Sequence, residues 1–283
     1  MELRHLFLSE TFHSRFPSQQ KDHFSCIRFL LPQRRDNFLY DLQTLWGLFV
    51  DEETPVKDGL DTLVNITKLG LACQSMSLEP VAMITQLEAV ADWIAKLEHL
   101  QSLRLKSRDE KGKPWILHLK SIENNVNLID MYLLGRLSSS SILPQFPKSL
   151  VELTLSHSSL EEDPMQLLKE LSNLRILSLL ADSYMGKTMF CQSKIFPLLH
   201  VLKFWKLQHF EEWIIEPGGL PCLRQLEIRS CPHLKMVPYG LKHVIDNTLL
   251  ELKLTDMPTD INVEACNIPR PPNCQVVVKT NFQ

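Results

Sequence analysis

Glycine is scarce in this sequence, with only 9 among 283 residues. Proteins that hold phosphate in backbone loops, and doubly wound enzymes, place glycine at their tight turns. The patterns G-x-x-x-x-G-K-[ST], G-x-S-x-G and H-E-x-x-H are also absent. No uncharged apolar run reaches the roughly 18 residues needed to cross a bilayer. The sequence therefore predicts no catalytic residue, no cofactor, no metal site and no membrane span.

An excess of one charge is lacking too, because 30 Lys and Arg face 33 Asp and Glu. Without a basic field the sequence gives no reason to expect nucleic acid or anionic lipid as a partner. Its 7 cysteines are an odd number without a disulfide-like spacing, and the start "MELRHLFLSETFHSRF" does not resemble a signal peptide. We therefore expect a cytoplasmic protein with reduced thiols.

Leucine is abundant instead, at 50 of 283 residues. The stretches "LEHLQSLRLKS", "LSNLRILSLLA" and "LPCLRQLEIRSC" share the spacing L-x-x-L-x-L. Successive copies lie 22 to 28 residues apart when they are aligned on one apolar position: Leu103, Met131, Leu153, Leu177, Leu202, Leu226 and Leu252. A period in the twenties with this core is the signature of a leucine-rich repeat.

The spacing has a physical cause. The L-x-L part predicts a short strand whose alternate side chains enter the core, and no single coil can bury its apolar side without a neighbour. We therefore predict an α/β leucine-rich repeat solenoid with one parallel strand per coil on its concave face. Less regular repeats are expected earlier, around Leu6, Ile27, Leu45 and Leu69.

Other segments are assigned to the convex side and the ends. Apolar residues at helical spacing predict a helix over Ile84–Leu97, and a second over Glu162–Leu174 with Pro164 in its first turn. The connection "RLSSSSILPQFPKS" should be irregular. We interpret residues 1–257 as about ten repeats, with an uncapped N-terminal coil that should make residues 1 to about 40 the least stable part. Residues 258–283 should form a cap or tail.

Two groups of residues have both a chemical and a structural interpretation. Cys222, Cys231 and His233 could ligate a metal, but their spacing matches no zinc pattern, and Cys231 falls where this repeat places Asn or Cys inside a turn. The pairs Glu161–Glu162 and Glu211–Glu212 could act in acid–base chemistry, but solvated turns explain them better. We favour the structural interpretation for both.

The candidate binding surface consists of the side chains that flank the buried leucines and point away from the core. A mixed-charge sheet with an exposed Tyr and Trp suits protein recognition, with Trp205 and Arg104 as the preferred anchors. The alternatives are a merely solvated face, or a site in the loops near 106–118 or 183–195. The predicted site residues are Lys68, Arg104, Lys106, Asp130, Tyr132, Glu152, Thr154, Lys203, Trp205, Glu227, Arg229, Glu251 and Lys253.

The phrases "LEIRSCPHLKMVP", "LQTLWGLFVDEE", "LRHLFLSE" and "GLDTLVNITKLGL" resemble repeats of plant coiled-coil nucleotide-binding leucine-rich-repeat disease resistance proteins. The resemblance covers essentially the whole chain. It implies a repeat domain that senses a pathogen effector, or a guarded host protein, and that holds a nucleotide-binding switch inactive. The nucleotide-binding domain of a related receptor is a further implied partner.

Neither N-terminal domain of that family is found in this sequence, so nucleotide binding and signalling are not implied for it. We expect a truncated paralogue, a partial gene model or an excised repeat domain. The main alternative function is a substrate-selecting adaptor of a ubiquitin ligase, or a general scaffold, because both also use leucine-rich repeats. An enzyme ranks behind these, since no catalytic constellation is visible.

Overall fold

The computed structural model describes residues 3–8, 41–77, 80–238 and 240–280. They form an α/β leucine-rich repeat solenoid of parallel strands, which confirms the predicted fold class. The chain divides into two compact units, Met1–Leu128 and Ile129–Gln283. The repeat predicted near Ile27 lies outside the described residues.

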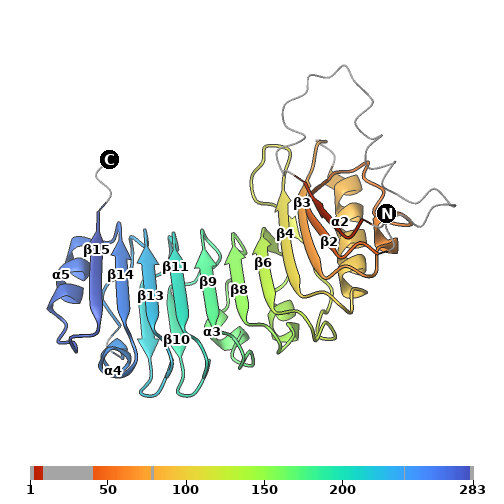
Figure 1. Ribbon diagram of the computed structural model, residues 1–283. Helices are drawn as coiled ribbons and strands as arrows, with labels where there is room; N and C mark the ends of the chain where they lie inside the picture. The colour runs from red at the N-terminus through yellow and green to blue at the C-terminus, as the bar shows by residue number, and fades with distance from the viewer. Residues whose placement is uncertain (1–2, 9–40, 78–79, 239, 281–283) are drawn as a thin grey trace. The chain divides into compact units, whose positions relative to one another are not determined.

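The first unit holds four parallel strands in chain order (Figure 1). These are β1 (His5–Phe7), β2 (Thr44–Val50), β3 (Lys68–Gln74) and β4 (Ser102–Arg108). β2 carries a bulge between Trp46 and Leu48. Gly47 occupies that bulge at φ 79°, where an added Cβ would lie 2.0 Å from the carbonyl oxygen of Leu8. A residue with a side chain would therefore push β1 away from β2.

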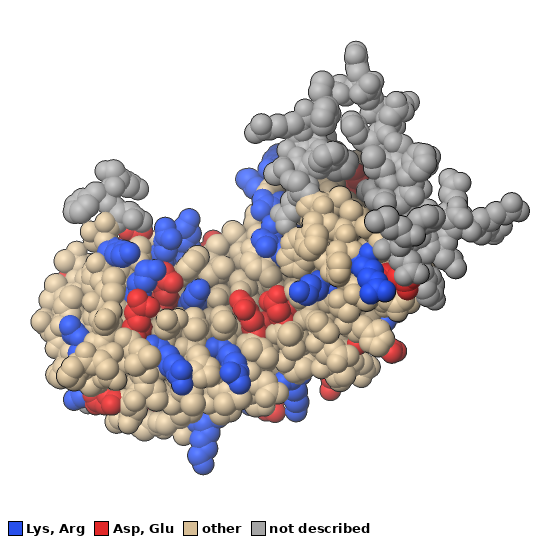
Figure 2. Space-filling view, viewed as in Figure 1, with Lys and Arg blue, Asp and Glu red and all other residues tan. Residues whose placement is uncertain are grey.

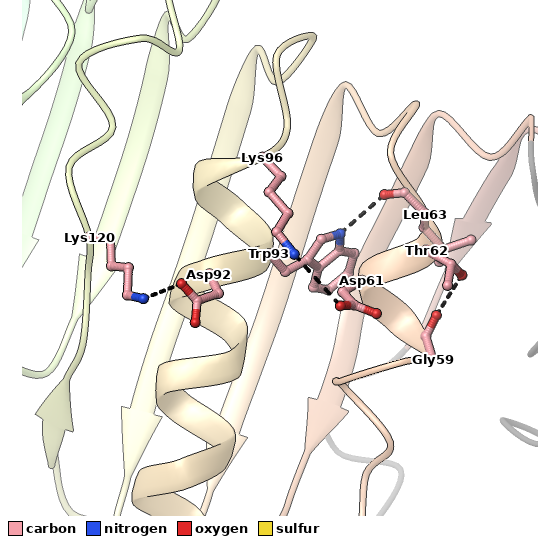
Figure 3. A network of polar contacts seen from close by, with 8 residues as sticks. All are labelled: Gly59, Asp61, Thr62, Leu63, Asp92, Trp93, Lys96 and Lys120. Carbon is pink, nitrogen blue, oxygen red and sulfur yellow. Dashed lines mark hydrogen bonds and ion pairs between the residues drawn. The ribbon is translucent and has the colours of Figure 1, made fainter.

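The helix α2 (Pro80–Ala95) confirms the first predicted helix and packs in the first unit (Figure 3). Leu87, Val90 and Ile94 are buried as expected, and so is Trp93, which the helical pattern alone did not single out. The Trp93 indole N–H donates to the Leu63 carbonyl at 3.1 Å, just after the 3-10 turn η1 (Leu60–Thr62). This bond attaches the helix to the preceding coil.

Seven parallel strands follow one another in the second unit, side by side in Figure 1. They are β6 (Asp130–Leu134), β8 (Glu152–Ser156), β9 (Ile176–Leu180), β11 (Val201–Trp205), β13 (Gln225–Arg229), β14 (Glu251–Thr255) and β15 (Gln275–Lys279). Every predicted strand centre from Met131 to Leu254 falls inside one of them.

The core of the second unit contains two apolar columns that run across these strands in register. Every side chain in the columns is 2 % exposed or less, so each coil seals its neighbours against water. The columns are Met131, Leu153, Leu177, Leu202, Leu226 and Leu252, and then Leu133, Leu155, Leu179, Phe204, Ile228 and Leu254.

Short elements connect the strands. They are β5 (Ile116–Leu117) in the first unit, then β7 (Arg136–Leu137), η2 (Ser140–Gln145), α3 (Pro164–Leu167), β10 (Thr188–Cys191), β12 (Glu212–Ile215), α4 (Leu241–Asn247) and α5 (Thr259–Asn267). β10 and β12 pair in parallel. No helix among the described residues is long and apolar enough to span a bilayer.

Two predictions for the connections need correction. The helix expected over Glu162–Leu174 is a single turn, α3, because Leu171 and Leu174 already belong to the coil that enters β9. The connection expected to be irregular contains the 3-10 helix η2 with Pro144 inside it. Beyond Met257, α5 leads into β15, which pairs with β14. Whether residues 258–283 act as a cap stays a prediction.

Candidate functional site

The outward side chains of β6 to β14 form three rows across the second unit, and we call this surface the open face. Parallel register places equivalent residues next to one another. The first row is Asp130, Glu152, Ile176, Val201, Gln225 and Glu251. The second row is Tyr132, Thr154, Ser178, Lys203, Glu227 and Lys253. The third row is Leu134, Ser156, Leu180, Trp205, Arg229 and Thr255.

All ten candidates predicted for this unit therefore lie on one surface. Alternation along each strand explains this outcome, because the neighbours of a buried leucine in L-x-L must point the other way. Thr154 and Ser178 are nearly covered, while the charged residues and Trp205 remain partly exposed. Whether these residues bind a partner stays a prediction.

Trp205 is the centre of a cluster of cations. The Lys203 ammonium and the Arg229 guanidinium each lie 5.8 Å from the centroid of its ring. Cations at this distance are attracted to the ring quadrupole. The indole N–H of Trp205 and the Nε–H of Arg229 are buried and have no hydrogen-bond acceptor among the described residues. The cluster thus contains two buried donors whose hydrogen-bonding capacity is unused among the described residues.

Carboxylates occupy both sides of this cluster. On β13 and β14, Glu227 and Lys253 form an ion pair at 2.9 Å. On β6 and β8, Asp130 and Glu152 are adjacent in the first row. Partial burial raises the pKa of Glu152, the charge of Asp130 raises it further, and Lys203 opposes them. The open face is therefore acidic at β6 and β8.

The three other candidates belong to the first unit and form a separate set. Lys68 is exposed on β3, and Arg104 and Lys106 lie on β4 in register with Gly70 and Ala72. Sequence reasoning missed Trp46, which shares the row of Gly70 and Arg104. An added Cβ on Gly70 would lie 2.8 Å from the Trp46 ring, so the indole lies directly against this glycine.

Three basic residues were also missed. Arg175, His200 and Arg224 each precede a strand by one position, outside the L-x-L triplets that were considered. Their side chains make no hydrogen bond or ion pair within the described part of the chain. Desolvation lowers the pKa of His200, and the charges of Arg224 and Arg175 lower it further. The sequence did contain a sign of this arrangement, because each of the three basic residues lies between the two leucines of the L-x-x-L spacing.

Cys231 has the structural position predicted for it. Its thiol is buried and lies 3.9 Å from the Phe204 carbonyl oxygen and 3.5 Å from that of Arg229. Burial raises the pKa of this thiol to about 11, so it is a poor nucleophile at neutral pH. Among the described residues no group of three His, Cys, Asp or Glu is placed to hold a metal.

The acidic pairs considered for acid–base chemistry are in surface connections. Glu211 forms ion pairs with Lys187 at 2.8 Å and with Lys235 at 2.5 Å. These three residues occupy equivalent places in successive coils. Glu162 accepts a hydrogen bond from Ser140. These carboxylates thus join neighbouring coils.

Comparison with known proteins gives consistent relatives in Arabidopsis thaliana, although no family model matches the chain. "Disease resistance protein RPP8" is 32 % identical over 224 residues, which cover 74 % of this chain and 24 % of the relative. "Probable disease resistance RPP8-like protein 4" is 30 % identical over 239 residues, which cover 82 % and 25 %. "Putative disease resistance protein At1g59780" is 41 % identical over 109 residues, which cover 38 % and 12 %. The chain spans about a quarter of the length of the first two.

Proposed function

This chain belongs to the plant disease resistance proteins of the nucleotide-binding leucine-rich-repeat type, and we propose that the open face of its second unit recognises another protein in plant defence. The partner is a pathogen effector or a host protein that an effector modifies. The described cysteines are all unpaired, which is typical of the cytoplasm, and we place the recognition there.

The Trp205 cluster carries this proposal. Aromatic and arginine side chains dominate the binding energy of protein interfaces, and they do so when they sit centrally on a face that the partner can cover. Trp205 meets this description, because Lys203 and Arg229 lie at its ring and its register neighbours on β9 and β13 are Leu180 and Arg229. The second row carries the small side chains Thr154 and Ser178 on β8 and β9. An arrangement of this kind offers contact area and directional donors without a catalytic centre.

The test compares what the chain retains from leaf extract before and after its open face is changed. The full chain, the double variant Trp205→Ala/Arg229→Ala and the control Lys194→Ala/Lys242→Ala are immobilised at equal amounts. Lys194 and Lys242 are exposed residues of the connections between strands. Bound proteins are quantified by mass spectrometry.

We expect at least one protein that the parent and the control retain equally and that the double variant loses. Removing an anchor of an interface costs about 2 kcal/mol or more, so retention should fall on the order of thirtyfold. If every retained protein binds the double variant as well as the parent, the open face around Trp205 is not the recognition surface. Reduced resistance in plants that lack the chain would connect the binding to defence.

A further inference from the structure

The residues that precede β9, β11 and β13 form a line of positive charge. The His200 N–H donates to the Arg175 carbonyl at 2.8 Å, and the Arg224 N–H donates to the His200 carbonyl at 2.9 Å. The three residues are therefore direct neighbours across parallel strands, about 4.8 Å apart from strand to strand. Arg175 and Arg224 are exposed.

These side chains have no ion-pair partner within the described residues, whereas several lysines elsewhere in the second unit do. Lys187 and Lys235 are neutralised by Glu211, and Lys253 is neutralised by Glu227. The guanidinium groups of Arg175 and Arg224 have no such partner, and they lower the pKa of His200 between them. A ligand that brings negative charge to this line would relieve that mutual repulsion.

The line continues into the open face, and together they form what we call the basic strip: β9, β11 and β13 with the residue before each. Its cations are Arg175, Arg224, Lys203 and Arg229, against the single carboxylate Glu227. Figure 2 shows Lys and Arg side chains over these strands, one group of carboxylates beside them toward β14, and another over β6 and β8. The whole chain has a net charge of −3. The strip thus carries a local positive charge, whereas the net charge of the whole chain is negative.

Apolar side chains accompany both groups of cations. Ile176 and Val201 occupy the first row, between the line and Lys203, and Leu180 and Trp205 share the third row with Arg229. A partner that carried only negative charge would leave these apolar residues in contact with water. A complementary partner therefore needs apolar side chains as well as negative groups. The strip is about 16 Å long from the line before the strands to the third row, at about 3.3 Å per residue.

Building on the proposed function, we propose that the basic strip binds an acidic segment of the partner protein, with carboxylates on Arg175 and Arg224 at one end and on Lys203 and Arg229 at the other, and apolar residues between. Asp130 and Glu152 repel the same segment from β6 and β8 and so fix its position along the sheet. Charge complementarity of this kind steers association and selects the partner.

The experiment selects random displayed peptides of about 12 residues, long enough to cross the strip, on the purified full chain. The enriched peptides are synthesised, and their dissociation constants are measured for four proteins: the parent, Arg175→Glu/Arg224→Glu, Trp205→Ala/Arg229→Ala and the control Lys194→Glu/Lys242→Glu. Arg175→Glu/Arg224→Glu and the control change the net charge equally, and their exposed positions should leave the unfolding midpoint unchanged. Arg175→Gln/Arg224→Gln replaces the first variant if that one does not fold.

We expect peptides rich in Asp and Glu, bound about a hundredfold more weakly by Arg175→Glu/Arg224→Glu, on the order of tenfold for each reversed charge. The control should bind them as the parent does. Enrichment of neutral or basic peptides, equal binding by the charge-reversed variant, or no enrichment would overturn the inference. So would equal competition by single-stranded DNA or by phosphatidylserine vesicles, which would indicate a general polyanion site.

The two proposals fail in different ways. Neutral peptides that lose affinity for Trp205→Ala/Arg229→Ala would leave the open face as a recognition surface and would reject only the acidic partner. Peptides that are insensitive to both double variants would reject both proposals.

Discussion

Two tryptophans of the second unit differ in what surrounds them, and their variants should differ accordingly. Trp213 is 2 % exposed and packs edge-on against Phe204 at 5.1 Å, whereas Trp205 is partly exposed on the open face. We predict that Trp213→Ala lowers the free energy of unfolding by about 3–5 kcal/mol. Trp205→Ala should change it by about 1 kcal/mol or less and weaken binding instead. Urea denaturation measures both; equal destabilisation would mean that Trp205 is a core residue.

Glu211 should show the strongest acid shift among the carboxylates on the outer connections. Hydrogen bonds from Lys187 and Lys235 lower its pKa from the ordinary 4.5 to about 2. A carboxyl whose folded pKa is depressed stabilises the fold above its unfolded pKa, and this contribution is lost as the pH falls from 4.5 towards 2. Carboxyl NMR titration should find Glu211 still ionised at about pH 3. Lys187→Met should raise its pKa; an unchanged titration would show that the lysine does not hold it.

At the same scale, residue orientation could be predicted wherever the L-x-L rhythm is intact. The ten open-face candidates of the second unit follow from alternation alone. Trp46 escaped prediction because Gly47 introduces a bulge that interrupts the rhythm. Arg175, His200 and Arg224 escaped because they sit before the strand, where period 2 gives no orientation and only the turn geometry decides.

Among the elements, the short helix α3 depends on one carboxylate. Asp163 accepts a hydrogen bond from the Met165 N–H at 2.8 Å, which caps the helix, and another from the Phe190 N–H at 2.7 Å in the next coil. Asp163→Ala should cost about 1 kcal/mol for the cap and about 1–3 kcal/mol for the unpaired Phe190 amide. Asp163→Asn keeps an acceptor oxygen and should cost less. Denaturant unfolding that shows no difference between Asp163→Ala and the parent would contradict this role.

The strands were more predictable than the connections for a physical reason. Each strand is dictated by its own buried leucines, whereas β10 and β12 pair only because two coils stack. The turns that follow the strands share a left-handed backbone conformation that the sequence did not indicate. Non-glycine residues at equivalent places, including Ala181, Lys206 and Ser230, have φ of 42°, 55° and 51°. Left-handed turns are therefore present although glycine is scarce. Backbone hydrogen bonds between neighbouring coils hold them in place, for example the bond from the Ala181 N–H to the Trp205 carbonyl.

At the scale of the molecule, period and composition sufficed to predict a leucine-rich repeat solenoid. They could not predict where charge collects, because that depends on register between residues about 25 positions apart. Only the register brings Arg175, His200 and Arg224 into one line and places Arg229 next to Trp205. The recognition surface we propose is a property of stacking and is not carried by any single repeat.

Hydrogen exchange of the full chain with and without a retained partner tests the central claim most directly. If the open face binds, amides in β9, β11 and β13 and in the residues just before them should exchange more slowly in the complex, because a bound partner excludes water and suppresses local opening. The variant Trp205→Ala/Arg229→Ala should lose this protection. Protection confined to the loops at 106–118 or 183–195, with the strands unchanged, would contradict the account.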